Sequence, residues 1–127
     1  MQQKKNYRTS VIATINGVDI LASLEDDQLV PIRPICYMLG ISTQMQTEKL
    51  KSDLLYVSVL KKCTSIGADG KRRKMFCLPY EYCFAWILGI QSLNARDEVR
   101  EKMREYQKKC ISALKEYFYG TPQQMKG

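Results

Sequence analysis

Residues 94–119 form a long amphipathic segment, which constrains the fold most because one of its faces has to be buried. Apolar side chains recur there at spacings of three and four residues, which predicts a single helix with Asn94 as its N-cap and Gly120 at its end. The apolar stripe consists of Val99, Met103, Tyr106, Cys110, Ala113 and Tyr117, widened by Ile111, Leu114 and Phe118. A stripe this wide favours packing against the domain's own sheet, and a two-helix seam that forms a homodimer is the alternative.

Residues 30–53, VPIRPICYMLGISTQMQTEKLKSD, predict two short helices joined by a glycine turn. Pro31 and Pro34 suit the first turn of a helix, whose amides have no partner within the helix. Gly40 supplies the left-handed residue that ends the first helix, and Ser42 is a good N-cap for a second helix that runs to about Ser52. This arrangement resembles a helix-turn-helix, a common DNA-binding unit.

The second of these helices has an outer face of polar and basic residues. Such side chains contact phosphates and base edges in proteins that bind the major groove. We expect Met45 and Leu50 to anchor the helix, because Gln46 stands where an apolar residue is usual. The predicted contact residues on this helix are Gln44, Thr47, Lys49 and Lys51. A helix pair that only packs, or that binds another kind of partner, remains an open alternative.

The rest of the chain predicts two β-hairpins and one more helix. Strand-like residues 9–14 and 18–24 are joined at Asn16-Gly17, a strong hairpin signal. Residues 55–66 and 72–78 predict a second hairpin with its turn at 68–70, and a helix follows over about 80–88 with Tyr82, Cys83, Trp86 and Ile87 toward the core. The predicted fold class is therefore α+β: a small antiparallel sheet of two hairpins, an inserted helix-turn-helix-like pair and a long C-terminal helix. We expect one domain over residues 9–119, a flexible N-terminus at 1–8, and a linker or tail at 120–127 that could lead to a further domain.

Positive charge is concentrated in the middle of the chain. The net charge is +7, and residues 31–80 carry nine basic and three acidic groups, a net +6. The cations of the second hairpin are Lys61, Lys62, Lys71, Arg72, Arg73 and Lys74. Clustered positive charge predicts a polyanion or an acidic protein surface as the partner, although a solvated turn would carry the same residues.

The residues needed for most catalytic chemistry are missing. The chain has no histidine, which removes the commonest general base, and it has no glycine-rich phosphate loop. Of the five cysteines, only Cys63, beside Lys61 and Lys62, has a cationic setting suited to a nucleophile, and that is weak support. We therefore expect a binding module rather than an enzyme, with no cofactor, metal or small-molecule substrate.

The sequence also lacks the features of export. No apolar run is long enough to span a membrane, and MQQKKNYRTS lacks the apolar centre of a signal peptide. We expect a cytoplasmic protein in which all the cysteines, none of them in a CxxC pair, are reduced and mostly buried.

Three stretches of the chain resemble a known family. VPIRPICYMLGI, IGADGKRRKMFCLPYEYCFAWILGI and EVREKMREYQKKCISALKEYF are similar to the amino-terminal domain of phage antirepressors of the Ant type. The resemblance runs from about residue 11 to 118, and a more distant one is to the Bro amino-terminal domain of large DNA viruses.

This resemblance implies a phage or prophage regulatory protein. Members of the antirepressor family bind and inactivate a transcriptional repressor, and some relatives bind DNA. The alternative function is therefore a direct DNA-binding regulator that uses the helix pair and the basic hairpin. The family supplies no catalytic residue and no binding position to carry over, so the contact residues named above rest on charge and expected exposure.

Overall fold

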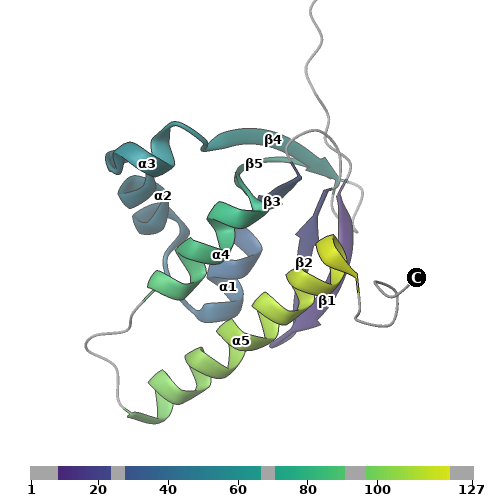
Figure 1. Ribbon diagram of the computed structural model, residues 1–127, viewed down its shortest axis with the longest axis vertical. Helices are drawn as coiled ribbons and strands as arrows, with labels where there is room; N and C mark the ends of the chain where they lie inside the picture. Colours follow the sequence, from purple (N-terminus) through teal and green to yellow (C-terminus); the bar gives the residue numbers. More distant parts are fainter. Residues whose placement is uncertain (1–8, 24–27, 67–70, 91–96, 121–127) are drawn as a thin grey trace, which may run out of the picture.

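Five strands and five helices form two small antiparallel sheets and a helical layer in the computed structural model, which describes residues 9–23, 28–66, 71–90 and 97–120 (Figure 1). The α+β class is confirmed. The elements, in chain order, are β1 (Ser10–Ile15), β2 (Val18–Ala22), β3 (Leu29–Pro31), α1 (Arg33–Leu39), α2 (Thr43–Ser52), α3 (Leu54–Val57), β4 (Lys61–Ile66), β5 (Arg72–Pro79), α4 (Tyr80–Gly89) and α5 (Asp97–Tyr119).

The first hairpin forms at Asn16-Gly17, as predicted. Asn16 and Gly17 have φ angles of 54° and 74°, the left-handed values that a tight hairpin turn requires. The Asn16 side chain also donates a hydrogen bond of 2.9 Å from Nδ2 to the carbonyl oxygen of Met38. The turn between β1 and β2 is therefore held against the end of α1.

The two predicted hairpins lie in separate sheets, because a strand that the sequence analysis missed joins the second one. β3 pairs with β5, and β5 pairs with β4, in the order β3-β5-β4. Pro31 is thus the end of a buried strand rather than part of a first helical turn, and α1 begins at Arg33 with Pro34 inside its first turn. The amide that follows Pro31, that of Ile32, donates to the carbonyl of Phe76 at 3.1 Å and continues the pairing with β5.

Helix α1 lies at the centre of the core. Ile35, Cys36, Met38 and Leu39 are all buried, and the helix packs against β2, α2 and α5. Gly40 ends the helix with a φ of 74°, which confirms its predicted role.

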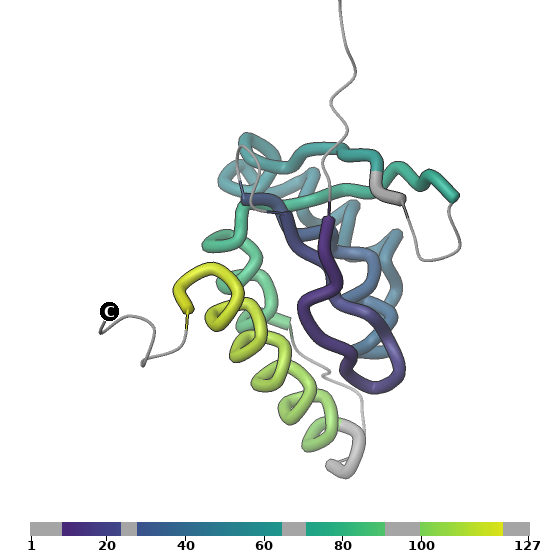
Figure 2. Tube along the Cα trace, turned by 90° about the vertical axis from the view of Figure 1, so that its right-hand side faces the viewer, coloured from purple at the N-terminus to yellow at the C-terminus, as the bar shows by residue number. Residues whose placement is uncertain are grey.

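Helix α5 runs beside α4 and the β1–β2 hairpin, as Figures 1 and 2 both show. Met103, Cys110 and Leu114 of the predicted stripe are buried, which confirms that the stripe packs within the domain. Because the packed face is used within one chain, a homodimer through it stays only a prediction. The Asn94 cap, the flexible 1–8 segment and the 121–127 part of the tail lie outside the described residues.

Gln107 of α5 joins α5 to the end of α4. Its Nε2 donates to the carbonyl oxygens of Ile87 at 2.7 Å and Ile90 at 3.2 Å. The last carbonyls of a helix have no partner within that helix, and at a buried site they need one from elsewhere. Gln107, itself only 9% exposed, donates to both carbonyls at the end of α4, and the Ile87 carbonyl also accepts from the Ile90 amide at 3.2 Å.

The predicted strand at 55–66 is wrong in its first half. Residues 54–57 form the short helix α3, and β4 begins only at Lys61. Asp53 explains the difference, because its Oδ1 accepts hydrogen bonds from the amides of Leu55 at 2.8 Å and Tyr56 at 3.3 Å. An aspartate in this capping position starts a helical turn, and the alternation of Val57 and Val59 was mistaken for a strand.

The expectation that all five cysteines are reduced is also wrong. Cys63 and Cys77 form a disulfide, whereas Cys36, Cys83 and Cys110 are free and buried as predicted. Lys61 is paired with Cys77 and Cys63 with Met75, so the two cysteines are diagonal neighbours on the buried face of the hairpin. The spacing of 14 residues did not reveal this, because the contact depends on the register of β4 against β5.

We predict that Gln107→Met lowers the free energy of unfolding by about 1–3 kcal/mol at nearly the same side-chain volume. It removes the side-chain donor from the Ile90 carbonyl and leaves the buried Ile87 carbonyl with only the Ile90 amide. Urea denaturation followed by circular dichroism measures the change. Lys108→Met, at an exposed position of α5, is the matched control and should change stability by less than about 0.5 kcal/mol. Equal stability of the two variants would show that Gln107 is not needed at the end of α4.

The buried thiols predict a loss of stability in alkali. Burial raises the pKa of Cys110 from 9.0 to about 12, so the folded chain keeps the proton while the unfolded chain loses it above pH 9. Stability from this group is complete below pH 9 and declines as pH rises toward 12, by up to about 1.4 kcal/mol per pH unit. We predict a shallower decline of unfolding free energy between pH 9 and pH 11 in Cys110→Ala. Parallel curves for the two proteins would rule out this contribution.

Candidate partner-binding face

Helix α2 is held by its N-cap residue and by one polar contact with α4. The Ser42 hydroxyl accepts a hydrogen bond of 3.1 Å from the amide of Met45, which confirms the predicted N-cap. Gln46 takes the inward position, where its Oε1 accepts a hydrogen bond of 3.1 Å from Nε1 of Trp86. Leu50 is buried as predicted, but the expectation that Met45 is an anchor is wrong, since Met45 is 61% exposed.

The predicted contact residues of α2 do not all reach the surface. Gln44, Lys49 and Lys51 are exposed. Thr47 is only 8% exposed, and its hydroxyl donates to the carbonyl of Thr43 at 2.8 Å. Thr47 is therefore not placed to act as a contact residue in this conformation, because it lies on the packed side of α2 and its hydroxyl is already bonded to its own helix.

The six hairpin cations do not form one patch, because the pleat of the sheet divides them. Residues paired across antiparallel strands lie on the same face, and neighbours along a strand lie on opposite faces. Lys62 is paired with Phe76 and Lys74 with Thr64, so these residues share one face with Arg72. Lys61 and the half-buried Arg73 belong to the opposite face, and Lys71, which is exposed, precedes β5.

Phe76 brings α2 and the hairpin together. The Lys51 ammonium from α2 lies 4.8 Å from the centre of the Phe76 ring, and the Lys62 ammonium from β4 lies 5.2 Å from it. Contacts of this kind are worth about 0.5–1 kcal/mol at exposed sites. Within the described part of the chain, neither lysine has a carboxylate partner. Two of the sequence-predicted cations therefore lie at one ring, and no carboxylate of the described residues neutralises them.

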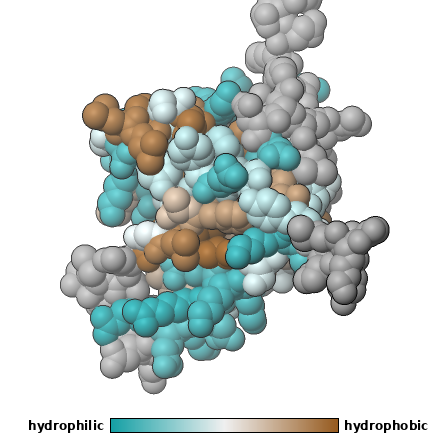
Figure 3. Space-filling view, viewed as in Figure 1, coloured by the Kyte–Doolittle hydropathy of each residue, from teal (hydrophilic) through white to brown (hydrophobic). Residues whose placement is uncertain are grey.

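A group of exposed apolar side chains lies on α3, which follows Lys51 in the chain and packs against α2, and on α2 itself. Leu54 is 89% exposed, Leu55 57% and Val57 45%, all on α3, and Met45 of the neighbouring α2 is 61% exposed. We call these four residues the apolar patch. Figure 3 shows apolar surface at the upper left, where Figure 1 places α3. A concentration of large apolar side chains on so short a helix indicates an interaction surface.

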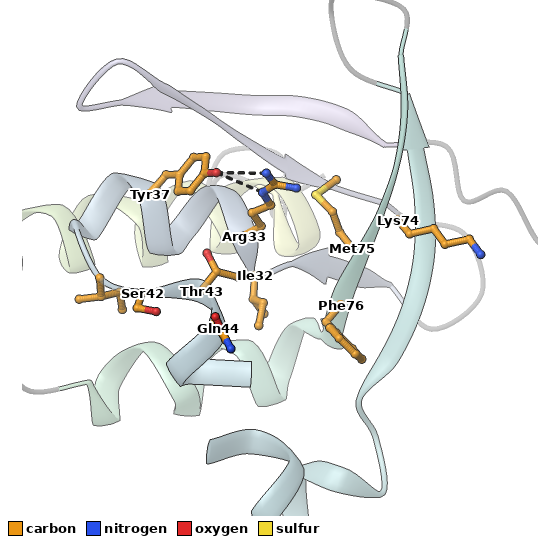
Figure 4. Close-up of a pocket in the computed structure, with 10 residues that line it drawn as sticks. Ile32, Arg33, Tyr37, Ser42, Thr43, Gln44, Lys74, Met75 and Phe76 are labelled. Atoms are coloured by element: carbon orange, nitrogen blue, oxygen red, sulfur yellow. Dashed lines mark hydrogen bonds between the residues drawn. The ribbon is translucent and has the colours of Figure 1, made fainter. Parts of the chain in front are cut away.

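Phe76 also lines a pocket of about 430 Å³ between α1, the start of α2 and β5 (Figure 4). Its floor includes Ile32, which is fully buried, and Met75, which is 8% exposed. At its edge the Arg33 guanidinium donates to the Tyr37 hydroxyl at 3.1 Å and 3.3 Å, and lies 5.5 Å from the centre of that ring. The remaining lining residues are Ile41, Ser42, Thr43, Gln44, Lys74 and Phe76.

Several residues of this face were missed in the sequence. Phe76 gave no pattern of its own, since its place beside α2 and the pocket depends on how the strands pair. Arg33 and Tyr37 are four residues apart on α1, and that spacing could have shown that their side chains meet. The adjacent Leu54 and Leu55 could have been recognised, because two leucines that follow a capping aspartate suit a helical turn better than a strand.

A family model for the P22_AR N-terminal domain matches residues 12–124, which is most of the chain. The chain therefore belongs to this family, and its predicted resemblance to the amino-terminal domain of phage antirepressors is confirmed. The comparisons with curated proteins and with solved structures found no match.

The described residues contain no helix that is both long and apolar enough to cross a membrane. They also contain no group of three or more histidine, cysteine or carboxylate side chains placed to hold a metal ion.

We predict that replacing both lysines at the Phe76 ring, Lys51→Gln with Lys62→Gln, changes the free energy of unfolding by less than about 1 kcal/mol. The loss of two weak ring contacts is offset by relief of the repulsion between two neighbouring cations. Guanidinium denaturation gives the value, with Lys102→Gln and Lys108→Gln on α5 as the matched pair. A loss above about 2 kcal/mol would assign the two lysines to the stability of the fold instead of to a partner.

Proposed function

We propose that this chain is a phage antirepressor-type module that binds a transcriptional repressor protein and inactivates it. Its membership of the P22_AR N-terminal domain family makes antirepressor-type regulation the general class of function. The single observation that supports a protein partner is the apolar patch beside Lys51 and Lys62.

The apolar patch favours protein over nucleic acid as the partner. Duplex DNA offers a phosphate backbone and polar groove edges, and it would leave Leu54 and Leu55 largely in water. A protein surface can bury both side chains, and each such leucine contributes roughly 1.5–3 kcal/mol when it is fully removed from water. The neighbouring lysines would then face acidic residues of the repressor and speed the encounter.

Direct DNA binding is the second candidate, and a different observation favours it. Gln44, Lys49 and Lys51 are exposed on α2, and Lys62 lies beside them on the hairpin. These residue types contact phosphates and bases, and the helix pair joined at Gly40 has the outline of a helix-turn-helix. In this alternative the basic hairpin would follow the DNA backbone.

Both candidates are binding functions, and we propose that they act in the cytoplasm of the host. We propose no catalytic role, since the chain has no histidine.

The test uses the repressor encoded in the same phage genome, immobilised for biolayer interferometry with the full chain. We predict that Leu54→Ser with Leu55→Ser weakens binding by roughly 30-fold or more, as expected for apolar residues at the centre of an interface. Leu88→Ser is the matched control, because Leu88 is a leucine of α4 that is 71% exposed and lies outside the apolar patch. Equal binding by the two variants would remove the apolar patch from the interface.

The DNA alternative is tested by the dependence of binding on salt. Contacts to six or more phosphates would reduce affinity for the operator duplex by roughly a thousandfold between 50 and 200 mM salt. We predict no operator binding of this strength, and repressor binding that varies much less with salt. Tight, steeply salt-dependent binding to the duplex without repressor would favour the second candidate.

A further inference from the structure

We infer that the pocket between α1, the start of α2 and β5 is an anchor site for an acidic peptide segment of the partner, which inserts one aromatic or large aliphatic side chain. This inference rests on the proposed function, because it assumes a protein partner, and it adds a second, smaller contact to the apolar patch.

The apolar floor of the pocket sets the chemistry of the anchor. Ile32 and Met75 form the base, and Phe76 and Ile41, both half-buried, extend it. A volume of about 430 Å³ is sufficient for one large side chain with part of its backbone. A phosphate or a sugar would leave this apolar base uncovered, so a hydrophobic side chain fits better.

Arg33, at the edge of the pocket, favours acidic residues on either side of the peptide's anchor side chain. Arg33 has the Tyr37 hydroxyl as its partner and no carboxylate within the described residues. A guanidinium can still donate to a carboxylate through its other N–H groups, and the two hydrogen bonds to the Tyr37 hydroxyl limit its rotation. In Figure 4 Arg33 lies beside Tyr37, and Lys74 extends away from α1 on the far side of β5. We therefore assign the main carboxylate contact to Arg33.

Two further residues, Gln44 and Phe76, complete the site. Gln44, exposed at the start of α2, can pair with the backbone of an extended peptide. Phe76 lines the pocket and also carries the contacts with Lys51 and Lys62. A partner segment could therefore run from the pocket past Phe76 to the two lysines, and its acidic residues would meet cations along this path.

The probes are three capped tripeptides, Glu-Phe-Glu, Glu-Ala-Glu and Lys-Phe-Lys, titrated into the ¹⁵N-labelled full chain. We expect Glu-Phe-Glu to shift the amide resonances of Arg33, Gln44 and Phe76 with a dissociation constant in the millimolar range. The other two peptides should bind roughly tenfold more weakly, because each lacks either the anchor or the negative charge. Equal shifts by all three peptides, or no shifts at these residues, would overturn the inference.

Two variants test the pocket with matched controls. Gln44→Trp fills the pocket from an exposed position and should reduce Glu-Phe-Glu binding at least about tenfold, whereas Ser112→Trp on α5 should not. Arg33→Met removes the positive charge at similar side-chain length and should weaken Glu-Phe-Glu binding, whereas its control Lys102→Met should not. The amide spectrum reports whether each variant is folded. A mixed-sequence DNA duplex that shifts the same resonances when Glu-Phe-Glu does not would also overturn the inference.

Failure of this inference can be distinguished from failure of the proposed function. If Gln44→Trp binds the repressor unchanged while Leu54→Ser with Leu55→Ser does not bind it, the pocket assignment is wrong and the function stands. If the peptide binds in the pocket but the repressor does not bind the chain, the anchor site stands and the proposed function is wrong.

Discussion

The burial of α1 is the constraint on which the rest of the structure depends. This helix has seven residues, too few to be stable alone, so it needs surrounding elements to remove its apolar side chains from water. β2, α2 and α5 pack directly on it, and the Asn16 side chain of the first hairpin reaches its last turn. Gly40 then turns the chain away from the core, because a left-handed residue there lets α2 leave in a new direction.

This arrangement places the candidate face at the edge of the core. α2 keeps Leu50 and Gln46 inside and turns Gln44, Lys49 and Lys51 outward, while Asp53 starts α3 and leaves its leucines in water. Phe76 of β5 contacts Lys51 of α2 and Lys62 of β4, so its ring lies between the helix and the hairpin. The pocket and the two lysines thus share Phe76, and the apolar patch lies on α3 and on α2, the helix that also carries Lys51.

Local patterns in the sequence predicted much of the fold but little of the site. The hairpin at Asn16-Gly17, the cap at Ser42, the stop at Gly40 and the stripe of α5 depend on near neighbours, and all four were predicted. The pairing of β3 with β5 and the approach of Lys51 to Phe76 join segments far apart in the chain. The disulfide and the contact of Lys62 with Phe76 depend on the register of β4 against β5, which no pattern within one strand specifies. Thr47 was misplaced because a hydroxyl bonded to its own helix looks the same in sequence as an exposed one.

The most direct test of the central claim, that this region binds a repressor protein, is hydrogen–deuterium exchange of the full chain with and without the repressor of the same phage. The account predicts slower exchange on binding in α2, α3 and the neighbouring strands β4 and β5, with the outer face of α5 unchanged. Protection confined to α5 or to the β1–β2 hairpin would contradict it, because the repressor would then bind a surface remote from the apolar patch and the lysines at Phe76.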